Sequence, residues 1–144
     1  MAKPDFTGTW LFNAAMSRLQ IPAPESSEFI IEHRDPHFRL TRTLVMQGRR
    51  DTFSIDLATD GSPFRLTHPR GYEIRGRAYW ADEVLAFDST IQQGDQEAIN
   101  EVRYRLSDDG RTLTAEERFR SRDLSYDNEW VLDLTGNAGG AQAV

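Results

Sequence analysis

The chain of 144 residues contains no cysteine. It can therefore form neither a disulfide nor a thiolate site for zinc or haem, and it has no thiol nucleophile. Long hydrophobic runs are missing as well, since no window approaches the roughly 18 apolar residues of a membrane-spanning helix. The N-terminal residues from Met1 to Asp5 carry no apolar run behind their charges. We therefore expect no membrane span, no signal peptide and a cytoplasmic location.

An excess of positive charge is also absent. The chain has 17 basic and 23 acidic residues, for a formal net charge of -6. This balance argues against nucleic acid as a partner, because phosphate binding requires a concentrated positive surface. Hydrophobic residues make up 38% and charged residues 28% of the chain, which is typical of one globular domain with a core.

Helical periodicity is scarce, and almost every segment alternates with a period of two and ends at a turn signal. The longest helical element predicted is one short turn at residues 14–18, capped by Asn13. We predict an all-β, antiparallel up-and-down barrel of eight to ten strands over residues 1–135, with a sandwich as the alternative. Residues 136–144 are small and polar, and we expect a flexible tail there. The predicted strands span residues 6–12, 27–33, 37–46, 49–57, 64–67, 72–80, 84–91, 96–106, 112–121 and 128–134.

The alternation also predicts which side chains face inward, and it places several polar ones on the apolar face. These are Arg42, Asn100, Tyr104, Glu117 and Asn128. Because an interior charge is costly unless it is paired or hydrated, two explanations stay open. The residues lie at a barrel mouth or pair with each other, as Arg42 could with Glu117, or they line a partly polar cavity that orients a ligand.

The first strand carries a family resemblance. The segment Asp5–Trp10, with its Gly8-x-Trp10 core, resembles the first-strand signature of the lipocalin-like (calycin) barrels, which include lipocalins and fatty-acid-binding proteins. Residues 5–19, 31–33 and 106–114 look like a group of small, uncharacterised bacterial lipocalin-like proteins. The resemblance implies a barrel closed at one end by Gly8 and Trp10, with Trp10 under Arg118 or Arg120. It implies a pocket but no reaction.

The function expected from these observations is the binding of a small, largely hydrophobic molecule inside the barrel of a monomer or homodimer. A filled interior, with an outer surface that binds a partner or an identical subunit, is a further possibility. The residues expected to line the site are Phe38, Arg42, Phe53, Tyr72, Trp80, Asn100, Tyr104 and Glu117.

An enzyme is the alternative. Glu117 in an apolar barrel is expected to have a raised pKa and could act as a general base, with Arg42 or Tyr104 stabilising an oxyanion. Cyclisation, isomerisation or proton abstraction on a hydrophobic substrate would suit such a site. We expect no cofactor and no metal. The competing hypotheses are a zinc site made by His33, His37 and His68, and haem bound by an inward His33 in a manner similar to nitrobindin-like barrels.

Overall fold

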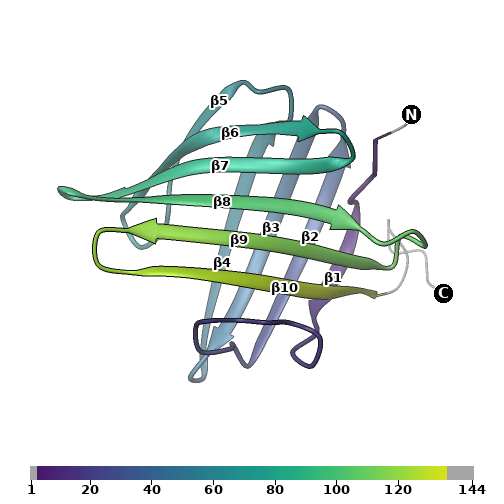
Figure 1. The fold of residues 1–144 in the computed structure, drawn as a ribbon, viewed down its shortest axis with the longest axis horizontal. Helices are drawn as coiled ribbons and strands as arrows, with labels where there is room; N and C mark the ends of the chain where they lie inside the picture. The colour runs from purple at the N-terminus through teal and green to yellow at the C-terminus, as the bar shows by residue number, and fades with distance from the viewer. Residues whose placement is uncertain (1–2, 136–144) are drawn as a thin grey trace.

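A computed structural model describes residues 3–135, and all regular structure in that range is antiparallel strand. Ten strands form one sheet in the order β4-β3-β2-β1-β10-β9-β8-β7-β6-β5 (Figure 1). The predicted all-β, up-and-down barrel is therefore confirmed. The strands are β1 (Gly8–Phe12), β2 (Ser26–Arg34), β3 (His37–Met46), β4 (Arg49–Ala58), β5 (Pro63–Thr67), β6 (Glu73–Ala81), β7 (Val84–Gln93), β8 (Gln96–Leu106), β9 (Thr112–Ser121) and β10 (Ser125–Thr135).

Tight hairpins set the register of neighbouring strands. Gln47 and Gly48 join β3 to β4 with φ angles of 51° and 74°, and Met46 is paired with Arg49. Two positive φ angles in a two-residue loop match the right-handed twist of the flanking strands. Because side chains alternate between the two faces of each strand, this register keeps the apolar side chains of β3 and β4 on the inner face.

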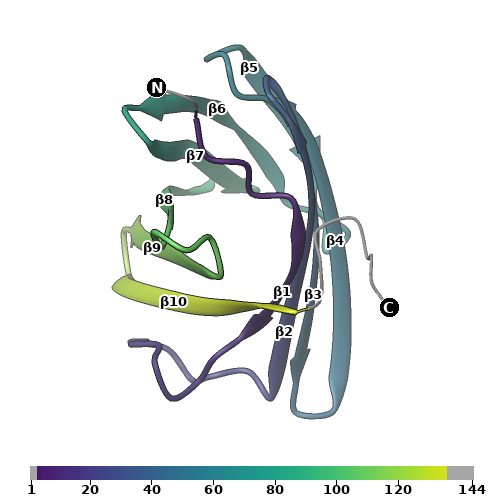
Figure 2. The ribbon, with the colours of Figure 1, turned by 90° about the vertical axis from the view of Figure 1, so that its right-hand side faces the viewer.

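The barrel is nearly closed. β1 to β4 form one wall and β6 to β10 form the opposite wall (Figure 2). β4 and β5 are the two edges of the sheet and do not pair with each other. Side chains close this seam: the rings of Phe53 and His68 lie 4.6 Å apart, and Arg70 forms an ion pair with Asp51.

Aromatic side chains fill one end of the barrel. Phe6, Trp10 and Phe38 are almost completely buried. The indole Nε1 of Trp10 donates a hydrogen bond of 2.9 Å to the carbonyl oxygen of Phe6. Gly8 has a φ of 150°, and a Cβ there would lie 2.6 Å from a side-chain carbon of Leu134, so this position requires glycine.

The expectation that Arg118 or Arg120 lies over Trp10 is wrong, because both side chains point away from the core. Arg118 lines a hollow on the outer face, and Arg120 pairs with Asp127 at 2.8 Å. Within residues 3–135, the cation–π contacts join Lys3 to Trp80 and Arg103 to Tyr79.

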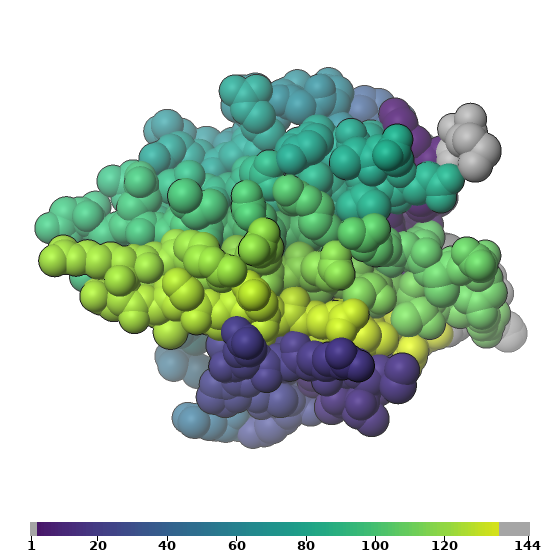
Figure 3. Space-filling view, viewed as in Figure 1, coloured from purple at the N-terminus to yellow at the C-terminus, as the bar shows by residue number. Residues whose placement is uncertain are grey.

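After β1 ends, the segment that leads to β2 runs alongside β10. We call residues 13–20 the strap; it lies beside β10 (Figure 3). It starts with the short turn predicted after Asn13: Ser17 N donates to the carbonyl of Asn13, and Met16 N donates to Oδ1 of Asn13 at 3.1 Å, which caps the turn. Arg18 and Glu129 exchange two backbone hydrogen bonds of 2.8 Å, which continue the pairing of β10 beyond the end of β1.

Two further expectations concern the ends and the membrane. The predicted flexible tail, residues 136–144, lies outside the described residues. Over residues 3–135 the structure contains no helix with the length and apolar character needed to cross a membrane.

Candidate binding cavity

A small cavity lies between the two walls of the barrel. Its volume of about 90 Å³ has room for roughly three water molecules, or for a ligand of similar size. Side chains from β2, β3, β8, β9 and β10 line it. They are Ser27, Phe29, Arg42, Leu44, Asn100, Val102, Tyr104, Ala115, Glu117 and Trp130.

The structure brings four of the eight expected site residues together at this cavity: Arg42, Asn100, Tyr104 and Glu117. The four aromatic residues expected as walls lie outside its lining. A role for Phe38, Phe53, Tyr72 and Trp80 in contacting a ligand stays a prediction.

Two of these aromatic residues belong to the closed end of the barrel. Phe38 is completely buried and packs against Phe87 at 5.4 Å. Trp80 stacks on Phe6 and donates from Nε1 to Asp35 at 2.9 Å. The other two lie at the β4–β5 seam, where Phe53 and Tyr72 pack on either side of His68.

The remaining lining residues were missed as site residues. The inward phase of Leu44, Val102, Ala115 and Trp130 is visible in the sequence, but phase alone cannot say which inward residues meet at a void. Ser27 gave no signal of its own, since a serine at the start of a strand is usually exposed.

Several polar groups in the cavity have no protein partner. Within the part of the chain that the structure describes, Arg42 makes neither a hydrogen bond nor an ion pair. The hydroxyl of Ser27 and the Oδ1 atom of Asn100 are buried without a hydrogen bond, and Ser27 is only 3% exposed. Tyr104 is buried, and its hydroxyl likewise has no partner among residues 3–135. Polar groups in this state usually bind water or a ligand.

The pair between Arg42 and Glu117, one of the two explanations left open above, is not formed within residues 3–135, and the carboxylate has other partners. Oε1 of Glu117 accepts hydrogen bonds from Nδ2 of Asn128 and Nε1 of Trp130, both at 3.0 Å. Oδ1 of the buried Asn128 accepts in turn from the backbone N–H of Gln20 at 2.8 Å. Asn128 therefore links the strap to the carboxylate in the cavity.

The electrostatics of the cavity favour a protonated Tyr104. Burial raises the pKa of Tyr104 well above its usual range, Arg42 lowers it in part and Glu117 raises it further. The hydroxyl is therefore a hydrogen-bond donor at neutral pH. Burial and Glu117 also raise the pKa of Tyr126 to about 12, against an opposing effect of Arg42. Acid–base chemistry by Glu117 stays a prediction.

The three histidines do not form a common site. His33 is bonded on both sides, because Nδ1 accepts from Phe6 N at 3.2 Å and Nε2 lies 3.1 Å from Asp35. His33 faces inward, as the haem hypothesis requires, but it has no ring nitrogen left for an iron atom. His37 pairs with Asp56 at 2.8 Å on the surface, and His68 lies at the seam. Among residues 3–135, no three His, Asp or Glu side chains are placed to hold a metal ion.

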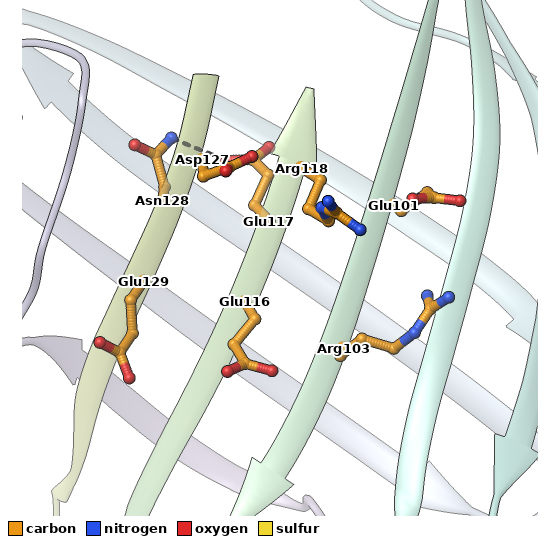
Figure 4. Close-up of a pocket in the computed structure, with 8 residues that line it drawn as sticks. All are labelled: Glu101, Arg103, Glu116, Glu117, Arg118, Asp127, Asn128 and Glu129. Atoms are coloured by element: carbon orange, nitrogen blue, oxygen red, sulfur yellow. Dashed lines mark hydrogen bonds between the residues drawn. The ribbon is translucent and has the colours of Figure 1, made fainter. Parts of the chain in front are cut away.

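A larger hollow, of about 460 Å³, lies on the outer face of β8, β9 and β10 (Figure 4). Its charged side chains point away from the barrel interior, apart from Glu117. The lining residues are Glu101, Arg103, Glu116, Glu117, Arg118, Asp127, Asn128 and Glu129. Arg103 is already paired with Asp88 at 2.9 Å. This charged, largely acidic surface does not suit an apolar ligand, so the interior cavity is the better candidate site.

Comparison with known proteins places the chain at the level of fold. No family model matches the sequence, and no curated protein matches it. Solved structures do match. Secretory abundant heat soluble protein 4 from Ramazzottius varieornatus has a TM-score of 0.62 at 14% identity, covering 94% of this chain and 99% of that one. Our chain of 144 residues therefore has the lipocalin-like barrel fold.

Two more structures share this lipocalin-like barrel. Zebrafish ileal bile acid-binding protein complexed with cholic acid has a TM-score of 0.58 at 12% identity, covering 90% of this chain and 98% of that one. Rv2717c from M. tuberculosis has a TM-score of 0.55 at 15% identity, covering 90% and 92%. The likeness spans nearly the whole barrel, which confirms the fold implied by the Gly8-x-Trp10 signature.

Proposed function

We propose that this protein binds a small molecule with a largely apolar body inside the barrel. The observation that carries the proposal is the composition of the cavity wall. Apolar side chains such as Phe29, Leu44 and Trp130 make up most of it, while the guanidinium of Arg42 has no partner among the described residues. Ligand pockets usually combine apolar walls with a few polar groups that fix the orientation of the ligand.

The fold supports the same function. The zebrafish barrel is a bile acid-binding protein whose structure was solved with cholic acid. The cavity of about 90 Å³ in our structure is well below the roughly 300 Å³ at which ligand pockets usually begin. The ligand is therefore compact, with a body that fits against Phe29, Val102 and Trp130.

Tryptophan fluorescence can test the proposal, because the indole of Trp130 lines the cavity. The protein is titrated with straight-chain alcohols, amines and carboxylates of about four to ten carbons. We expect a saturable change in fluorescence with the shorter compounds. Compounds whose chains are too long for the cavity should give a weaker change. Trp130→Phe should remove the signal while heat of binding is still measured by calorimetry.

A cavity-filling variant supplies the matched control. Ala115 is 3% exposed and faces the cavity, so Ala115→Leu should fill it and abolish binding. Thr114→Leu adds a side chain of the same kind on the opposite face of β9 and should bind as the wild type does. The proposal is wrong if no compound gives a saturable response, or if Ala115→Leu binds with unchanged affinity and unchanged fold.

A further inference from the structure

Two of the unpartnered donors of the cavity lie on one wall. Ser27 on β2 and Arg42 on β3 are diagonal neighbours on the inner face, since Phe29 is paired with Arg42 and Ser27 with Leu44. A guanidinium has five N–H donors and no acceptor, so only an acceptor group can satisfy it. This wall therefore offers a fixed positive charge and an adjacent hydroxyl to the interior.

The unpartnered acceptors lie on the opposite wall. Asn100 on β8 presents a buried Oδ1 atom without a hydrogen bond. Glu117 on β9 is its diagonal neighbour, since Val102 is paired with Glu117 and Asn100 with Phe119. Both hydrogen bonds to Glu117 within residues 3–135 end on Oε1, so Oε2 can accept another donor. Figure 2 shows β2 and β3 across the barrel from β8 and β9.

The two walls do not neutralise each other. Arg42 and Glu117 line the same cavity but form no ion pair within the described range. An interior charge without a counter-charge is unfavourable, and hydrogen bonds from Asn128 and Trp130 offset only part of this at Glu117. A molecule with a negative group at one end and a positive donor at the other would satisfy both walls at once.

The geometry points to a zwitterionic ligand: a compact carboxylate that bears an ammonium group across a short apolar spacer. This inference rests on the proposed function. The carboxylate binds Arg42, whose planar fork matches two carboxylate oxygens, with Ser27 as a further donor. The ammonium binds Oε2 of Glu117 and Oδ1 of Asn100. The spacer lies against Phe29 and Trp130, and the volume of about 90 Å³ limits its length.

Three four-carbon probes test the inference by calorimetry with the wild-type protein at neutral pH: 4-aminobutanoate, butanoate and butylamine. We expect 4-aminobutanoate to bind about tenfold more tightly than either probe with one charged end, because it alone satisfies both walls. Equal affinity of 4-aminobutanoate and the better single-ended probe would overturn the inference. The proposed function would still stand, provided that butanoate or butylamine binds saturably.

Two variants assign the ends. Arg42→Met should lower the affinity for 4-aminobutanoate about tenfold and leave butylamine unchanged. Glu117→Gln should lower the affinity for 4-aminobutanoate by a similar factor and leave butanoate unchanged. Arg39→Met is the matched control, since Arg39 is an exposed residue on the other face of β3. The assignment would be contradicted if Arg42→Met weakened butylamine as much as 4-aminobutanoate, or if Arg39→Met lost as much affinity as Arg42→Met.

Discussion

The backbone N–H of Phe6 donates a hydrogen bond of 3.2 Å to Nδ1 of His33. The other nitrogen of His33 lies 3.1 Å from Asp35, and the ring packs against both Phe6 and Trp80, whose own rings are in contact with each other. The segment before β1 is thereby tied to the end of β2 beneath the aromatic core. His33 is thus a structural residue of the closed end, and both of its nitrogens are occupied.

Replacing this histidine should weaken the fold. His33→Leu removes the acceptor of a buried backbone donor and one donor to Asp35. We expect the free energy of unfolding in urea to fall by about 2–3 kcal/mol. His37→Leu is the matched control, because its hydrogen bond with Asp56 is mostly exposed to solvent; its effect should stay below about 0.5 kcal/mol. Equal effects of the two variants would contradict the structural role.

The two inward asparagines should differ in their contribution to stability. Asn128 is hydrogen-bonded to Gln20 and to Glu117, so Asn128→Ala should lower the free energy of unfolding by about 2–3 kcal/mol. Asn100 has an unsatisfied Oδ1 atom, so Asn100→Ala should lower it by about 1 kcal/mol or less. Thermal and urea unfolding of the two variants measures the difference. A larger loss in Asn100→Ala would show that Asn100 has a partner in solution.

The seam histidine should make stability depend on pH. Burial, Arg42 and Arg70 lower the pKa of His68 below its usual 6.5, and Asp51 offsets this only in part. The unfolded chain therefore binds the proton more readily, and protonation favours unfolding. The stabilising effect of a neutral His68 is complete above about pH 6.5 and is lost as the pH falls through the lower folded-state pKa.

Urea unfolding at about pH 7.5 and about pH 5 measures this contribution. The loss of stability at the lower pH should be smaller in His68→Gln than in the wild type. His37→Gln, at an exposed position on β3, should keep the wild-type dependence. If His68→Gln loses as much stability on acidification as the wild type does, the titrating group lies elsewhere.

Glycine at the start of β1 should be required for stability. Gly8→Ala places a Cβ in contact with Leu134 at a φ that other residues rarely adopt. We expect a loss of about 2 kcal/mol in the free energy of unfolding. Thr9→Ala, at the next position of the same strand, should cost less than about 1 kcal/mol in the same assay. A tolerated Gly8→Ala would mean that β1 can shift relative to β10.

Part of the candidate site could be predicted, and part could not. Arg42 and Glu117 were placed on the inner face because alternation along a strand is a local property. A pair between them was one of two explanations left open, and it does not form within the described residues, since Glu117 is instead bonded to Asn128 and Trp130 on the adjacent strand. Which inward residues meet depends on strand register and barrel curvature, which a single sequence does not contain.

The sequence by itself determined the strands, their hairpins and the orientation of each side chain, because these depend on neighbours a few residues apart. Gly8 and Trp10 likewise mark the closed end of the barrel through a signature of only a few adjacent residues. Only the tertiary structure decided that Phe38 fills the core with Trp80 packed against it, and that Arg42 has no partner among residues 3–135 across from Asn100 and Glu117. The physical reason is that a cavity is a property of two walls facing each other. Those walls come from strands more than fifty residues apart in the chain.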